Sequence, residues 1–516
     1  MAVCSTRCES TERILLAASS TLILLAWVAL FFSDVNHPPG VRTARLAGAA
    51  LVIAIGILEY VRPWWGFCAF LIFWPQMMVA RELLQKVLGP TWGAFPTITT
   101  GPLAAALVIG FTLRNWKLDR DPAFSLPPAS PEKSNTAAHV KWIRIALWCL
   151  AATWTLSAAI ATIRLMKGPP AGWHVDPADW RHASGPSAFS VLAPAASALR
   201  TVPEFLLGLV LFNDLARKNR ARVNAPIDRM LTCIAIGAAL VAVELLLQLA
   251  LNRDWAFDDN PPSGPFNNRN TTSPVLLFFG LLCLAAQSRQ IEKVLWQVLS
   301  AICIGLACVI SSRNGLFMAA VLGTILLTLR LKRPWIVLVV AAMGLAICFW
   351  APLPKSESLS LGTTRRVVET VENARAGNWD AVTSYRSELY RSAFKIFGSH
   401  PILGSGPATF PMLASPGSIY AVTGYGAYFS AHSMPLNLAA ETGIFGMLAW
   451  LALWLAIPCA MLWKKFRSSW LWIAVLMFGI ANLFDTVWFA AGMGTLSMLM
   501  LWFACADDTV PAGPVS

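Results

Sequence analysis

The chain has 516 residues, of which 56% are hydrophobic and only 13% are charged, about half of the charged share of an ordinary globular protein. This composition excludes a soluble multidomain enzyme and a disordered chain, because neither keeps so much apolar surface away from water. With 40 basic and 27 acidic residues the net charge is +13, an excess that in a membrane protein reports loop sidedness. We therefore expect an all-α polytopic membrane protein.

Apolar stretches recur along the whole chain at the length of membrane-crossing helices, which need about 20 residues. Some are short or interrupted by proline or glycine, so we expect about 12–14 crossings. The first follows Arg7 and Arg13 without a clear cleavage site, and we interpret it as a retained signal anchor. The stretches are 13–32, 45–61, 64–81, 99–114, 141–163, 194–214, 229–251, 273–288, 293–311, 314–330, 335–352, 434–463, 470–488 and 490–505.

Basic clusters predict which loops face the cytoplasm. All follow even-numbered stretches, so one orientation, with a cytoplasmic N-terminus, places every cluster inside. The longest hydrophilic segment, 353–433, then lies outside, which in a Gram-negative cell is the periplasm. We divide the chain into an N-terminal bundle (1–252), helices with outer turns (253–352), this large loop (353–433) and C-terminal helices (434–516). The clusters are Arg114–Arg120, Arg217–Arg222, Arg289–Lys293, Arg330–Arg333 and Lys464–Arg467.

Two outer-face segments carry arginines. Arg313 lies in a turn between two apolar stretches, where it is either an interfacial anchor or an anion-binding group. Its planar fork of donors suits a diphosphate. Arg386 opens an amphipathic helix in which Arg391 is expected on the solvated face. The Gly404-Ser-Gly406 turn that follows comes after no strand, so it is not interpreted as a phosphate loop.

Three further positions on the outer face carry polar groups that suit a site. His432 stands at the entrance of the stretch 434–463, either as a cap or as a group that handles protons near neutral pH. Glu441 lies within or just below the membrane–water interface. Its structural interpretation is a hydrogen bond that fixes the helix near Gly443. The turn ending in Asn270 suits either sugar hydroxyls or the capping of the next helix.

A few other charges fall inside apolar stretches. Arg200 and Glu204 are four residues apart and can pair on one helix face, and Asp485 lies near the end of 470–488. We interpret the Arg200–Glu204 pair as structural, although a transporter would also explain all three charges. The long outer loop and the absence of internal repeats count against a transporter.

The order of the outer-face segments resembles the O-antigen ligase and polymerase superfamily of bacterial envelope glycosyltransferases. The resemblance covers roughly residues 255–460. The residues that carry it are Gly264–Asn270, Ser312-Arg313, Tyr385-Arg386, His400–Gly406, Ala431-His432 and Ala440–Gly443.

The resemblance implies a metal-independent, cofactor-free glycosyltransferase in the inner membrane. Its donor would be a glycan on undecaprenyl diphosphate, and its acceptor lipid A–core for a ligase or a second lipid-linked glycan for a polymerase. Its other partners would be membrane lipids, with no nucleic acid. We favour the ligase and keep the polymerase, or a lipid-linked glycan transporter, as alternatives.

The resemblance also assigns roles to residues. Arg313 and Arg386 are similar to the family arginines that hold the diphosphate, and His432 is similar to the family histidine that activates the acceptor hydroxyl or assists the leaving group. Ser433 stands where the family often has Asn. For substrate binding we expect Arg269, Asn270, Tyr385, Arg391 and Glu441.

Overall fold

Helices make up almost the whole structure, and no strand occurs among the residues that it describes. The all-α polytopic class is thus confirmed. The computed structural model describes residues 11, 14–26, 39–79, 95–120, 136–168, 191–215, 221–251, 269–287, 293–310, 313–330, 362–382, 386–414, 430–464, 470–489 and 492–507. The predicted stretch 335–352 lies outside these residues.

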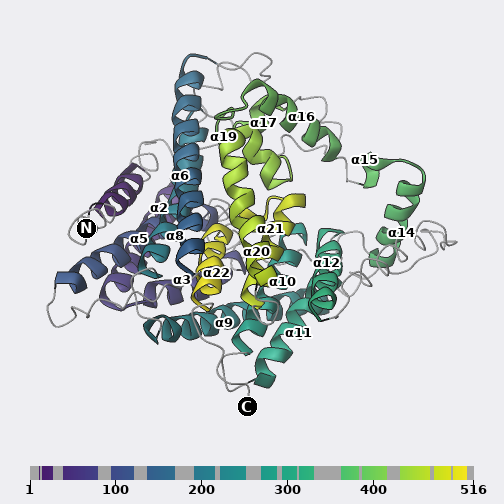
Figure 1. Cartoon of the computed structure of the whole chain (residues 1–516), viewed down its shortest axis with the longest axis horizontal. Coiled ribbons are helices and arrows are strands. Elements are labelled where there is room, and N and C mark those ends of the chain that lie inside the picture. The colour runs from purple at the N-terminus through teal and green to yellow at the C-terminus, as the bar shows by residue number, and fades with distance from the viewer. Residues whose placement is uncertain are drawn as a thin grey trace.

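The apolar stretches between residues 45 and 330 coincide with helices (Figure 1). The longest of them exceed the roughly 20 residues that a crossing needs. Their bounds are α2 Pro39–Val61, α3 Trp65–Val79, α5 Phe95–Arg120, α6 Thr136–Met166, α8 Ala193–Leu215, α9 Ala221–Leu251, α10 Arg269–Gln287, α11 Lys293–Val309 and α12 Arg313–Arg330.

Four helical stretches are long and apolar enough to cross a membrane, and shorter apolar helices accompany them among the described residues. Length and composition alone thus support a membrane protein. The four stretches are His139–Met166, Ala193–Leu215, Pro226–Leu251 and Met434–Trp463.

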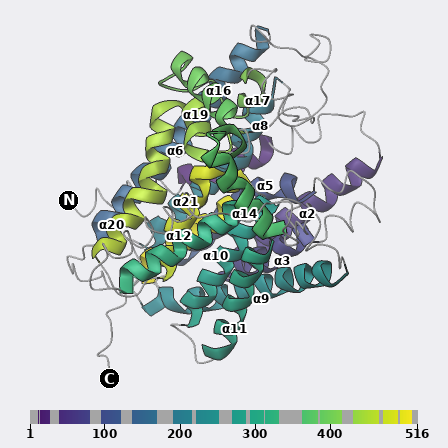
Figure 2. The ribbon, with the colours of Figure 1, turned by 90° about the vertical axis from the view of Figure 1, so that its right-hand side faces the viewer.

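The large hydrophilic segment carries short helices, of which α16 and α17 lie at the end of the molecule where α19 begins, whereas α14 lies away from it, at the right of Figure 1 (Figures 1 and 2). The expected amphipathic helix is present as α16, with Leu389, Ala393 and Ile396 buried and Phe394 exposed. Its buried face packs against Phe410 and Ala440. The helices are α14 Gly362–Arg375, α15 Trp379–Val382, α16 Arg386–Ser399 and α17 Phe410–Leu413.

The C-terminal helices end differently from their predicted spans. The stretch 470–488 is helical only to Phe484, because the chain breaks at Asp485 before a short 3-10 turn. This break lies at the end of α21, beside the start of α19. The elements are α19 Met434–Leu451, η5 Ala452–Ala456, α20 Ile457–Lys464, α21 Trp470–Phe484, η6 Val487–Phe489 and α22 Met493–Asp507.

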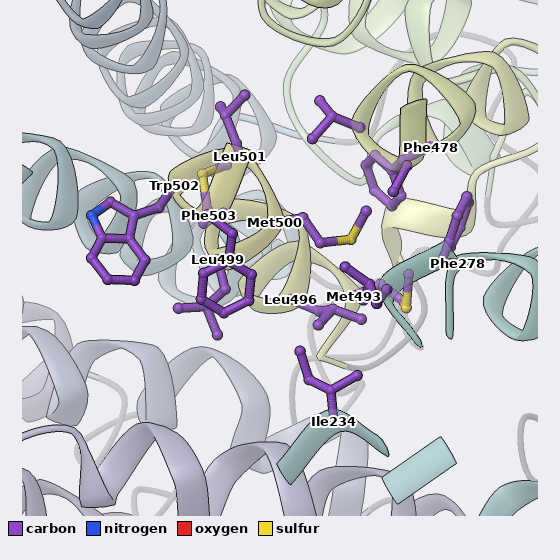
Figure 3. Close-up of a cluster of buried hydrophobic side chains, with 14 of the residues drawn as sticks. Ile234, Phe278, Phe478, Met493, Leu496, Leu499, Met500, Leu501, Trp502 and Phe503 are labelled. Carbon is purple, nitrogen blue, oxygen red and sulfur yellow. The ribbon is translucent and has the colours of Figure 1, made fainter. Parts of the chain in front are cut away.

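The helix α22 forms the centre of the core (Figure 3). Residues 492–506 are all buried, which is typical of a helix that is apolar all round. Figure 3 shows Leu496, Leu499 and Phe503 on α22 with Ile234 of α9 below them. The final helix therefore joins early and late parts of the chain.

Candidate active site

A kink at Gly443 divides α19 into two helical parts. Gly443 has φ 76° and ψ −169° in an otherwise helical run. A Cβ atom at this position would lie 2.1 Å from the carbonyl oxygen of Ile402, and the amide of Ile444 donates to Pro401 at 2.9 Å. Only glycine permits both this conformation and this approach. The turn after α16 is thereby fixed against α19.

Glu441 supports the same junction. Its Oε1 accepts the amide of Phe410 at 3.0 Å, and its Oε2 accepts Nδ2 of Asn437 at 2.9 Å. Its carbonyl accepts the amide of Gly406 at 2.9 Å and the hydroxyl of Ser157 at 2.7 Å. A buried carboxylate needs such partners, and here they are protein groups. Direct substrate binding by Glu441 stays a prediction.

The segment that carries His432 is held from two sides. His432 has φ +50°, a left-handed conformation that is uncommon for residues other than glycine and that recurs at functional sites. The amide of Ala431 donates to Oδ1 of Asn437 at 3.1 Å. The hydroxyls of Ser430 and Thr486 lie 2.9 Å apart. Contacts to α19 and to the break after α21 thus fix the histidine.

Asp485 is the partner of His432. The Nδ1 atom of His432 lies 3.0 Å from Oδ1 of Asp485, which also accepts the amide of Thr486 at 2.8 Å. Asp485 lies in the turn beyond α21, outside any helix. Burial raises the pKa of this carboxyl, but the hydrogen bond and charge of His432 and the charge of Arg386 outweigh it, so the pKa is below its usual value. The carboxylate therefore stays ionised near neutral pH.

Arg386 completes this cluster from α16. Its guanidinium donates to the carbonyl of Phe484, and its Nη2 lies 3.4 Å from Oδ2 of Asp485. One turn on, burial raises the pKa of the Tyr390 phenol, while the charge and hydrogen bond of Arg386 oppose this rise. His432 and Arg386, 46 residues apart in number, thus meet on one carboxylate.

The helix α12 brings position 313 to the same region. Arg313 is the first residue of α12, and its side chain lies outside the described part. The ring of Phe317 is 4.8 Å from the ring of Phe484, the residue before Asp485. Residues four apart share a helix face, so position 313 lies on the face of α12 that meets the end of α21.

The structure shows no contact between the remaining predicted residues and the cluster of His432, Asp485 and Arg386 among the side chains that it describes. Arg269 and Asn270 open α10, which packs against α21 and α12, but their side chains are not described, and Tyr385 lies outside the described residues. The side chain of Arg391 is 69% exposed and pairs with Glu388. This is the solvated face that the sequence predicts, and substrate binding by these four residues stays a prediction.

The residue whose role the sequence analysis missed is Asp485. It was noted only as a charge in an apolar stretch. One signal points to it: the basic cluster at Lys464–Arg467 is expected inside, so the next helix must end at the outer face. Asp485 at that end then shares a membrane side with His432.

The cluster has the chemistry of a proton acceptor beside an anion-binding group. A carboxylate on Nδ1 orients the imidazole and stabilises its protonated form. The guanidinium of Arg386 adds a fixed positive charge at a partly buried position, where charge interactions exceed those in water. Among the described residues no three His, Cys, Asp or Glu side chains are grouped closely enough to hold a metal ion.

Comparison with known proteins identifies this region. Residues 298–451 match a family model described as O-antigen ligase. This part of the chain is similar to the O-antigen ligase family. The resemblance to the O-antigen ligase and polymerase superfamily is thus confirmed. A search of curated proteins finds no match to the chain.

The matched region contains Arg313, Arg386, His432 and Glu441, whereas Asp485 lies after its last residue. The C-terminal helices therefore contribute Asp485 to a candidate site whose other residues lie in the matched region.

Proposed function

We propose that the chain is a metal-independent glycosyltransferase of the periplasmic face of the inner membrane. It moves a glycan from undecaprenyl diphosphate to a hydroxyl of lipid A–core, as an O-antigen ligase. The observation that carries the proposal is that the carboxylate of Asp485 contacts both His432 and Arg386. A possible base, the imidazole, therefore lies beside a cation, the guanidinium. The match to the O-antigen ligase family supports the substrate class.

In the proposed reaction, His432 acts on the acceptor. Because Nδ1 faces Asp485, the opposite nitrogen, Nε2, takes the proton from the acceptor hydroxyl as its oxygen bonds to the anomeric carbon. The bond from that carbon to the diphosphate oxygen breaks, and its electron pair leaves with the diphosphate. A positioned base contributes about 10²- to 10⁴-fold to the rate of such a step.

The arginines act on the leaving group. Negative charge grows on the diphosphate as the glycosidic bond breaks, and cations fixed in advance stabilise that charge without reorganisation. Arg386 is held by the end of α21, and position 313 lies on the face of α12 nearest that end. Two guanidinium groups would thus supply the positive charge for which other glycosyltransferases use a divalent ion.

The first experiment is the glycolipid profile of a strain that lacks the protein, rescued by wild type or by His432→Ala. Long glycan retained on undecaprenyl diphosphate, with bare lipid A–core, supports the ligase. Single repeats on the core without a ladder support the polymerase instead. An acceptor requirement in proteoliposomes separates both from a transporter, which needs no acceptor.

The matched control is His139→Ala, which removes a histidine from the first turns of α6. It should rescue like wild type. Full rescue by His432→Ala would contradict the proposed role of this residue.

A further inference from the structure

Two charged residues of α8 have no part in the proposed reaction. Arg200 is half-buried and the side chain of Glu204 is almost fully buried, in a helix long and apolar enough to span the membrane. Charges in such helices are costly and need partners. Because the two are four residues apart, they face the same neighbours.

Arg200 contacts the break that separates α21 from α22. Its guanidinium donates to the carbonyl of Phe489, the last residue of η6. Carbonyls at the end of a helix lack partners inside it, and the arginine supplies a donor to this one. The first half of the break is thereby tied to α8.

Glu204 contacts the other half. A Cβ atom at Gly494 would lie 1.9 Å from its Oε2, so the carboxylate rests against the backbone at the start of α22. The first amides of a helix lack internal acceptors and favour negative charge, so Glu204 caps α22 from a separate helix.

Aromatic packing joins the two contacts. Phe205 of α8 lies 5.7 Å from Trp488 of η6, measured between ring centroids. The amide of Trp488 in turn donates to Oδ1 of Asn482 on α21 at 2.9 Å. The short element η6 is therefore fixed between α8 and α21, and Asp485 lies two residues before it.

We propose that Arg200 and Glu204 are positioning residues of the active site. They fix both ends of the break between α21 and α22, and so hold Asp485 where it meets His432 and Arg386. Neither residue touches substrate. This inference rests on the proposed function, in which the Asp485–His432 contact supports the base.

The test replaces the contacts one at a time in the full chain. Arg200→Met keeps the length of the side chain but removes its donors, and Glu204→Gln removes its charge. A misplacement of about 1 Å costs on the order of 10²-fold in rate, so we expect kcat to fall 10- to 100-fold while KM for the donor changes less than about twofold. Arg200→Lys, which still donates to Phe489, should recover most of the activity.

A second readout reports on His432 itself. Diethyl pyrocarbonate modifies imidazole, and the modified peptide is quantified by mass spectrometry over time at one fixed pH. Asp485 lies 3.0 Å from Nδ1 of His432, so displacing this carboxylate should change the rate of modification of His432 in Arg200→Met in the same direction as Asp485→Asn does.

The matched control is another buried Arg–Glu pair that also serves a helix start. Glu59 accepts the amides of Trp64 and Gly66 at the start of α3 and pairs with Arg114. Trp64 stacks on Trp502, far along α22 from Gly494. Arg114→Met should lower thermal stability without changing the rate of modification of His432.

The two proposals fail differently. If Arg200→Met loses stability like Arg114→Met but keeps wild-type kcat and a wild-type rate of His432 modification, the positioning role is wrong. If Arg200→Met fails to fold, kcat and the modification of His432 are measured in Glu204→Gln and Arg200→Lys instead, and these two variants decide the question. If His432→Ala remains active, the proposed function is wrong, whereas a changed rate of His432 modification in Arg200→Met would still support the positioning of Asp485.

Discussion

The imidazole of His432 and the carboxylate of Asp485 lie 3.0 Å apart, although 53 residues separate them in the chain. One belongs to the segment that enters α19, and the other to the break that follows α21. The start of α19 and the end of α21 lie side by side, because the two helices run antiparallel. The proposed active site is therefore assembled at this shared end of the pair. Its precision depends on how that pair and its connections are held.

Asp485→Asn tests the contact directly. The amide keeps the size of the side chain but loses the charge that favours the protonated ring during proton transfer. We expect kcat to fall about 10²-fold or more, with donor binding nearly unchanged, measured by glycan transfer in proteoliposomes. An Asn variant with wild-type kcat would show that the carboxylate has no part in the reaction.

Arg386→Lys and Arg313→Lys test the leaving-group cations. Lysine keeps the charge but cannot make the bidentate contact of a guanidinium. Each variant should lose most of its transfer activity, about 10-fold or more for the removal of charge-assisted donors. The matched control, Lys395→Ala on the exposed face of α16, should stay close to wild type. Equal losses in the control would point to a general effect of α16.

Acid should weaken the protein through Asp485. Its pKa lies below the usual value because the contributions of His432 and Arg386 outweigh burial. A carboxylate with a lowered folded-state pKa stabilises the fold at pH values above its unfolded pKa, about 3.9, and this contribution is lost as pH falls through the folded pKa. The unfolding temperature in detergent should therefore decrease more steeply below about pH 4 in wild type than in Asp485→Asn. Parallel curves would contradict this linkage.

Gly443→Ala tests the kink in α19. The φ of 76° alone costs a residue with a side chain about 1–3 kcal/mol, and the new Cβ would overlap the carbonyl of Ile402. We expect a lower unfolding temperature and lower activity. The control is Gly398→Ala in α16, where a Cβ meets no atom within 4 Å and alanine should stabilise by about 0.4–1 kcal/mol. If Gly443→Ala keeps the wild-type unfolding temperature and activity, the turn at Ile402 can move away from the new side chain.

The sequence predicted those features that depend on local pattern. Apolar length placed the helices, and the spacing of Leu389, Ala393 and Ile396 predicted the buried face of α16. It also marked His432 and Arg386, because polar groups at the mouth of an apolar stretch stand out.

The features it missed depend on contacts between distant segments. Asp485 gains its role only from a partner on another helix. The turn at Gly404 and Gly406 is explained by its fit against Glu441 and Ala161, which no local pattern contains. The early end of α21 likewise follows from tertiary contacts, since the residues after Phe484 are still mostly apolar.

The central place of α22 has a consequence for how the protein is made. During synthesis the N-terminal segments are inserted first, yet α8 and α9 contact a helix that begins only at Met493. Until α22 has been synthesised and inserted, the space that it occupies in the folded protein must be filled by lipid or closed by movement of α8 and α9. Nascent chains that stall before residue 493 should therefore be bound by membrane chaperones and cleared by proteases. In the same chains Glu204 has no helix start to cap, so the membrane would hold an unsatisfied carboxylate until translation passes α22.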